Sequence, residues 1–224
     1  MKYKVFWCKV NKYYTDEWLN SAYLSDKAWV FIASCVVTDK AKRKWLKFVK
    51  DELKTLKDNE KIYISWCGAF EKWEENEKFF QTYEELAGAE NKIEILPESP
   101  NENKKLWQNT ENKPKIDLSK KLGGLKSIYT KKFIVIQGWC DSFCTFCLTV
   151  IKRWKHYYRT KEDIVDEITD FESRWWKEVV LTWVNLCAWW LEHTNDFKNS
   201  KFDELIEYIL EKTEIPRIRI SSLW

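Results

Sequence analysis

Three cysteines lie close together in the second half of the chain, with the spacing Cys140-x-x-x-Cys144-x-x-Cys147. They follow an apolar run at residues 132–137 that predicts a strand, and a helix is expected directly after them. Three thiolates on one short loop can hold three irons of a four-iron cluster, which leaves the fourth iron open to a small ligand. Backbone amides and a helix N-terminus would stabilise the negative charge of such a cluster. The spacing therefore predicts an iron–sulfur centre with one open iron.

A zinc loop or a redox-sensing trio of thiols is the alternative interpretation of these three cysteines. Zinc requires a fourth ligand, and neither His156 nor His193 lies at the spacing found in zinc fingers or ribbons. The spacing and the preceding strand together favour the iron–sulfur centre.

Strand-like and helix-like segments alternate along the chain, which is typical of parallel α/β sheets. In the first half, strands are predicted at 3–7, 29–36 and 61–66, and helices at 11–24, 39–56 and 71–86. In the second half, strands are predicted at 132–137, 178–182 and 217–221, and helices at 160–175 and 201–211. The polar stretch between the halves contains three prolines and a Gly-Gly pair. We therefore predict an α/β domain at 1–96, an irregular connection at 97–131, and a second β/α domain at 132–224.

The composition narrows the class of protein. Seven cysteines without a secretion signal argue against a disulfide framework and for metal or redox use. No apolar run approaches the roughly 18 residues of a membrane span, so we expect a cytoplasmic protein with no membrane partner. The net charge of +3 permits an RNA partner without requiring one.

The chain resembles the radical S-adenosylmethionine methylthiotransferases, a family that modifies tRNA or a ribosomal protein. The resemblance covers nearly all of the chain and is strongest in FIVIQGWCDSFCTFC, IKRWKHYYRT and VVLTWVNLCAW. It implies that Cys140, Cys144 and Cys147 hold a [4Fe–4S] cluster whose open iron binds S-adenosylmethionine.

Three further cysteines, in FWCKVNKYYTDEW, ASCVVTDKAKRK and ISWCGAF, belong to the same resemblance. It implies that Cys8, Cys35 and Cys67 hold a second [4Fe–4S] cluster. Each of them lies at or just beyond the end of a predicted strand, and parallel strands gather ligands at their carboxyl ends. On their residue type alone, they would be interpreted as buried core residues.

The stretches CKVN and CVVTDKAKRK look most like the branch of the family that acts on N6-threonylcarbamoyladenosine beside the tRNA anticodon. The implied reaction is methylthiolation of the adenine C2 carbon, with tRNA as substrate and a flavodoxin or ferredoxin as electron donor. Two alternatives remain open. One is a methylthiotransferase for isopentenyladenosine in tRNA or for a ribosomal-protein aspartate, and the other is a non-catalytic iron–sulfur redox or electron-transfer protein.

The resemblance also implies binding residues outside the cysteine motifs. Thr182, Trp183 and Asn185 follow a predicted strand where the family contacts the amino-acid moiety of S-adenosylmethionine, although ordinary loop polarity would explain them equally well. The remaining Cys187 is expected to be a packed, small apolar residue.

A basic run with interleaved tyrosines lies between the cysteine motif and the next predicted helix. Arg153, Lys155 and Arg159 in this run are candidates for binding RNA phosphates. A solvated surface is the alternative interpretation of the same residues.

The chain departs from the family in two respects. Fewer β/α units precede Trp224 than the family's barrel contains, so we expect an incomplete barrel, an N-terminal fragment and doubtful activity. The second departure is composition: 15 tryptophans stand beside only 5 glycines, whereas glycine makes up about 7% of an average protein.

Many of the tryptophans stand where the family has glycine or another small residue. Those concerned are Trp7, Trp66 and Trp139, each directly before a cysteine, and Trp154, Trp175, Trp176, Trp183 and Trp190. We hypothesise that the gene encodes many of them with UGA, a codon that some bacteria translate as glycine. The alternative is a genuinely tryptophan-rich protein.

Overall fold

The computed structural model describes residues 2–6, 8–25, 29–69, 77–97, 99–100, 129–138, 140, 142–145, 157–191 and 197–221. The chain divides into two compact units, Met1–Pro100 with Thr145–Arg153, and Asn101–Cys144 with Trp154–Trp224. The predicted connection at 97–131 falls largely outside the described residues. None of the helices in the described part of the chain has the length and apolar character of a membrane span.

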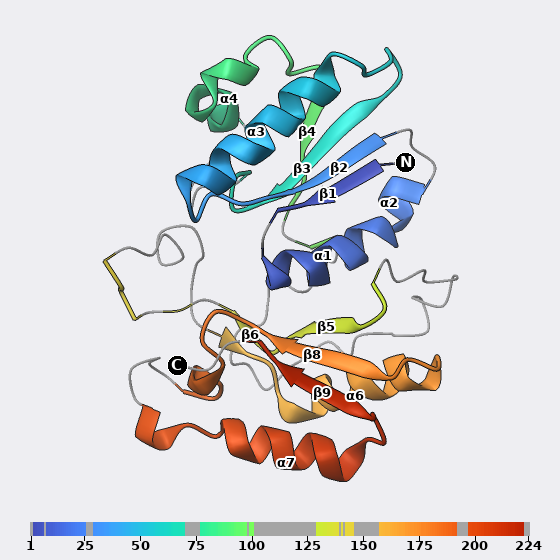
Figure 1. The fold of residues 1–224 in the computed structure, drawn as a ribbon, viewed down its shortest axis with the longest axis vertical. Coiled ribbons are helices and arrows are strands. Elements are labelled where there is room, and N and C mark those ends of the chain that lie inside the picture. The colour runs from blue at the N-terminus through green and yellow to red at the C-terminus, as the bar shows by residue number, and fades with distance from the viewer. Residues whose placement is uncertain are drawn as a thin grey trace. The chain divides into compact units, whose positions relative to one another are not determined.

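A four-stranded parallel sheet forms the centre of the first unit (Figure 1). Its strands are β1 (Lys2–Val5), β2 (Trp29–Ser34), β3 (Lys61–Trp66) and β4 (Ile93–Ile95), adjacent in that order. Every neighbouring pair is parallel, with Val5 opposite Ala33 and Ser34 opposite Trp66. The predicted α/β fold with a parallel sheet is therefore confirmed.

Among the described residues, the helices of the first unit are α1 (Lys9–Leu19), α2 (Ala22–Ser25), α3 (Asp39–Leu53) and α4 (Glu77–Thr82), with a 3-10 turn, η1 (Glu84–Leu86). The α3 helix begins as its sequence predicts, because the Thr38 hydroxyl accepts a hydrogen bond from the Ala41 amide at 3.1 Å. The single helix predicted over 11–24 is wrong. Asn20 and Ser21 interrupt it, since their side chains donate to the carbonyls of Asp16 and Trp18.

The second unit contains a three-stranded parallel sheet in the order β5 (Lys132–Val135), β8 (Glu178–Thr182), β9 (Arg217–Ile220). Its described residues also form the helices α6 (Lys161–Ser173) and α7 (Phe202–Lys212) and the 3-10 turns η4 (Leu186–Ala188) and η5 (Phe197–Asn199). The Thr160 hydroxyl caps α6 by accepting from the Asp163 amide at 3.2 Å.

The strand predicted at 132–137 is divided in two. After β5 the chain forms β6 (Gln137–Gly138), which pairs antiparallel with β7 (Tyr157–Tyr158). Its continuous apolar pattern could not indicate this break, because the partner of β6 lies about twenty residues further along the chain.

Three of the tryptophans that the structure describes have a left-handed backbone conformation. The φ angles are 78° at Trp66, 69° at Trp175 and 68° at Trp190, and Phe143 has a φ of 47°. A side chain at positive φ collides with its own backbone, so glycine is the usual residue there. All three are among the positions where glycine was hypothesised. Trp183, which was also among them, does not have a positive φ.

Candidate functional site

Three cysteines mark one edge of the first sheet. Cys35 directly follows β2 and Cys67 directly follows β3, while Cys8 lies just beyond β1 and forms the N-cap of α1. Because these strands are parallel and neighbours, the three cysteines share the carboxyl edge of the sheet. All three are thiols; Cys35 and Cys67 are buried and Cys8 is half-buried. The topology thus brings together the residues predicted to hold the second cluster.

The backbone beside Cys67 is packed tightly against β2. The Gly68 amide donates to the Ser34 hydroxyl at 3.0 Å, and that hydroxyl donates to the Ser65 carbonyl at 2.6 Å. A Cβ atom at Gly68 would lie 2.8 Å from Ser34 Oγ and 3.0 Å from the Trp45 ring. Gly68 is therefore required for this close approach, which fixes the loop that carries Cys67.

The three thiols share one edge of the sheet, but they are not close enough together to coordinate one metal ion. Nowhere in the described residues do three Cys, His, Asp or Glu side chains form a group that could hold one metal ion. Trp66 is the last residue of β3, directly before Cys67. It has positive φ, and its ring centroid is 4.5 Å from that of Tyr14. The donor set suits an iron–sulfur cluster in residue type and position, while ligation by these three residues stays a prediction.

The cysteine motif of the second unit begins directly after β6. Cys140 is buried, and its Sγ donates to the Ser142 hydroxyl at 3.3 Å, whereas Cys144 is exposed. Phe143, between them, is also exposed and has positive φ, which is typical of a sharply turning loop. Cys147 and Trp139 lie outside the described residues.

Beside this loop, three buried polar side chains each have an oxygen without a hydrogen-bond partner among the described residues: Gln137 Oε1, Thr182 Oγ1 and Asn185 Oδ1. They lie at one edge of the second sheet. Thr182 is the last residue of β8 and lies opposite Val135 of β5. The side-chain amide of Gln137 donates a hydrogen bond to the backbone carbonyl of Asn185. Buried polar atoms nearly always have a partner, so this set fits a polar ligand.

Two of these residues, Thr182 and Asn185, were predicted to contact S-adenosylmethionine, and Gln137 was missed. Its signal in the sequence was a polar residue at the end of an apolar run, three positions before Cys140, and the structure shows that it is buried. The third predicted residue, Trp183, is also buried, and its carbonyl accepts from the Ser221 hydroxyl at 3.5 Å.

Arg159, which was predicted to bind RNA, lies in the interior of the second unit. Its side chain is 3% exposed, and its guanidinium donates to the carbonyls of Val135 and Asp163 and to the Glu167 carboxylate, at 3.1, 3.0 and 2.6 Å. These contacts join β5 to α6, so the geometry gives Arg159 a structural role and does not support contact with RNA. Arg153 and Lys155 lie outside the described residues. Cys187 is half-buried, and its backbone carbonyl accepts a hydrogen bond from the Ser200 hydroxyl.

Comparison with known proteins relates the chain to tRNA-modifying enzymes. No protein-family model matches it. Over 92 residues it is 36% identical to the tRNA-2-methylthio-N(6)-dimethylallyladenosine synthase of Malacoplasma penetrans (strain HF-2), which covers 41% of this chain and 18% of that protein. Over 210 residues it is 26% identical to the synthase of the same name from Staphylococcus aureus (strain JH9), which covers 86% of this chain and 38% of that protein. The chain thus spans less than two fifths of the length of these relatives.

Proposed function

We propose that this chain provides two iron–sulfur sites and an S-adenosylmethionine site for methylthiolation of an adenosine in tRNA. The observation that carries the proposal is a set of buried oxygens, on Gln137, Thr182 and Asn185, next to the loop that begins at Cys140. None of them has a hydrogen-bond partner among the described residues. The similarity to tRNA methylthiolating synthases over 86% of the chain supports the same interpretation.

In this proposal, Cys140, Cys144 and Cys147 hold the cluster that binds S-adenosylmethionine, and Cys8, Cys35 and Cys67 hold the second cluster. When bound, these groups supply radical chemistry and the sulfur that is transferred. The chain itself positions the ligand. The three oxygens at the edge of β5 and β8 are acceptors for the ammonium group of its amino-acid moiety. Their burial excludes water that would compete for the same hydrogen bonds.

The relatives favour dimethylallyladenosine, which is isopentenyladenosine, as the substrate. Both of them carry that nucleoside in their name, whereas the predicted threonylcarbamoyladenosine has no support among them. Mass analysis of tRNA nucleosides from cells that lack the gene distinguishes the two. Loss of the methylthio group from dimethylallyladenosine supports the proposed substrate, and its loss from threonylcarbamoyladenosine would contradict it.

The cysteine assignments predict a stepwise loss of iron. After anaerobic reconstitution, the chain should bind roughly eight irons, and Cys140→Ala should bind roughly four. S-adenosylmethionine should alter the electron paramagnetic resonance signal of the reduced chain and of Cys8→Ala, but not that of Cys140→Ala. Cys187→Ala is the matched control and should retain all of its iron. A signal that S-adenosylmethionine leaves unchanged in every variant would instead indicate a redox or electron-transfer protein.

Thr182→Val separates ligand binding from folding. Because the Thr182 hydroxyl lacks a partner in the described structure, its replacement by an isosteric methyl group should leave the protection of β8 amides in hydrogen exchange unchanged. The affinity for S-adenosylmethionine should fall about 3- to 10-fold.

Thr160→Val is the control, with the opposite pattern. It removes the cap of α6 and should lower the protection of the first turn of that helix, without changing affinity. Unchanged affinity in Thr182→Val would remove this residue from the proposed site.

A further inference from the structure

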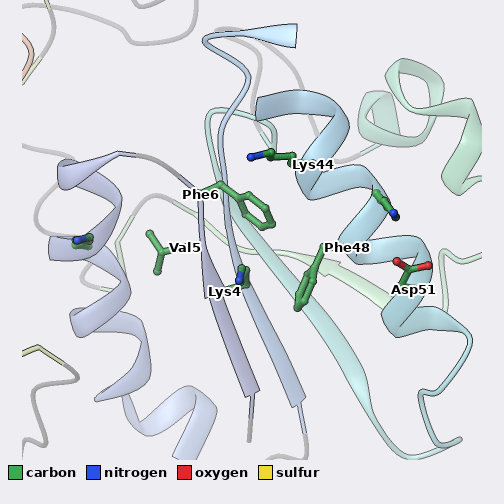
Figure 2. Close-up of a pocket in the computed structure, with 8 residues that line it drawn as sticks. Lys4, Val5, Phe6, Lys44, Phe48 and Asp51 are labelled. Atoms are coloured by element: carbon green, nitrogen blue, oxygen red, sulfur yellow. The ribbon is translucent and has the colours of Figure 1, made fainter. Parts of the chain in front are cut away.

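A hollow of about 560 Å³ lies beside the edge strand of the first unit. Residues from β1, α1 and α3 line it (Figure 2). Four of them are lysines, Lys4, Lys12, Lys44 and Lys47, and Asp51 is the one carboxylate among the described lining residues. The net charge of the whole chain is +3, so this hollow concentrates positive charge that the composition does not reveal.

The lysines surround an apolar floor. Phe6 and Phe48 form it, with their ring centroids 6.0 Å apart and an edge-to-face geometry (Figure 2). The ammonium group of Lys4 lies 6.0 Å from the centre of the Phe48 ring, within the range of a cation–π contact. An apolar floor lowers the local dielectric constant and therefore strengthens the attraction of the surrounding lysines for an anion.

Helix α3 supplies the regular spacing of the charges. Lys44 and Lys47 are exposed and three residues apart, so they lie on one face of the helix with Cβ atoms about 5–6 Å apart. Asp51 continues the same face, but its carboxylate also pairs with Lys54 at 3.2 Å. This pairing weakens the negative charge that Asp51 contributes to the lining.

We propose that this hollow, formed by Lys4, Lys12, Lys44 and Lys47 over Phe6 and Phe48, binds phosphates of an RNA backbone. The choice of RNA rests on the proposed function, whose substrate is a tRNA. Lysine ammonium groups serve as point charges for phosphates and carry no base specificity, so the contact would position the RNA without reading its sequence. Lys12 lies in α1 four residues after Cys8, which places the hollow next to the cysteine edge of the same unit.

The test compares the 224-residue chain with a double variant, Lys44→Gln with Lys47→Gln. The control, Lys57→Gln with Lys92→Gln, removes the same charge from residues that do not line the hollow. The dissociation constant for unmodified tRNA is measured between 50 and 200 mM salt. Replacement of Lys44 and Lys47 should weaken tRNA binding about 3- to 10-fold. It should also lower the slope of log affinity against log salt concentration by about two, and the control variant should change neither quantity.

Two further measurements decide what occupies the hollow. Inorganic phosphate should compete only weakly with tRNA, and polyglutamate should bind at least tenfold more weakly than tRNA. Three results would each overturn the proposal. They are an equal loss of tRNA affinity in the two double variants, no measurable tRNA binding by the unaltered chain, and polyglutamate binding as tight as that of tRNA. Iron content and the response to S-adenosylmethionine are recorded in the same samples. A chain that binds no iron or does not respond to S-adenosylmethionine would contradict the proposed function. Unchanged tRNA affinity in the double variant would contradict only the role of the hollow.

Discussion

Replacing Arg159 with methionine is expected to destabilise the second unit by about 3–5 kcal/mol, because the change leaves a buried partner charge without compensation. The Arg159 guanidinium is 3% exposed and binds the Glu167 carboxylate at 2.6 Å, and Glu167 is itself 12% exposed. Lys132 also approaches Glu167, at 3.5 Å, but offers a single ammonium in place of a fork of donors. The carbonyls of Val135 and Asp163 would lose their donors as well.

Native-state hydrogen exchange measures this effect locally, which suits a chain with two compact units. In Arg159→Met, the amides of β5 and α6 should lose protection from hydrogen exchange. The amides of β2 and β3, in the first unit, should keep their protection. Arg174→Met is the matched control on the same helix. Its pair with Asp170 is partly exposed, so its loss should cost less than about 1 kcal/mol.

The same variant tests the original assignment of Arg159 to RNA. If its main role were to bind phosphate, Arg159→Met would weaken tRNA binding while the protection of β5 and α6 stayed intact. Arg159→Lys should recover only part of the protection, since lysine cannot donate to two carbonyls and a carboxylate with the geometry of a guanidinium.

Arg159 was a candidate RNA-binding residue in the sequence, but in the structure it is buried and joins β5 to α6. A run of basic and aromatic residues is typical of both RNA-binding surfaces and structural ion pairs. The partners that decide between them, Val135 and Glu167, lie 24 residues before Arg159 and eight after it. The alternation of strands and helices, in contrast, was predictable from local patterns. The parallel order of β1, β2 and β3 then places Cys8, Cys35 and Cys67 at one sheet edge, although the strand predicted at 29–36 ends at Ser34.

Local chemistry also explains the errors within the elements. Thr38 and Thr160 cap α3 and α6, which begin directly after them. The helical pattern over 11–24 continued through Asn20 and Ser21, whose side chains bond to the backbone and end α1. The polar role of Gln137 was hidden because its surroundings depend on Asn185, which lies 48 residues away.

The tryptophans differ from one another in ways that predict their codons. Trp18 and Trp189 are buried, and their indole nitrogens donate to the carbonyls of Pro97 and Arg159 at 3.1 and 2.9 Å, bonds that glycine cannot make. Trp66, Trp175 and Trp190 have positive φ. Under the codon hypothesis, the gene should carry UGG at positions 18 and 189, and UGA at 66, 175 and 190. UGG at the latter three positions would refute the hypothesis.

The neighbouring residues Trp175 and Trp176 allow a direct physical test of the same difference. Trp175 follows the C-cap of α6 in left-handed conformation, its amide donates to the Glu172 carbonyl at 2.9 Å, and its side chain is 85% exposed. This is the position where helices most often end in glycine. Trp175→Gly should therefore stabilise the unit by about 1 kcal/mol, because it relieves backbone strain and loses almost no buried surface.

Trp176→Gly should act in the opposite direction, because the Trp176 ring stacks on Phe171 with centroids 5.1 Å apart and an interplanar angle of 14°. Loss of this contact and the added freedom of the unfolded chain should cost about 1–2 kcal/mol. Hydrogen exchange of the last turn of α6 measures both variants under one condition. Opposite signs for two adjacent tryptophans would show that backbone conformation marks the positions suited to glycine. Destabilisation by both would contradict the strain assigned to Trp175, and with it the structural support for the codon hypothesis at that position.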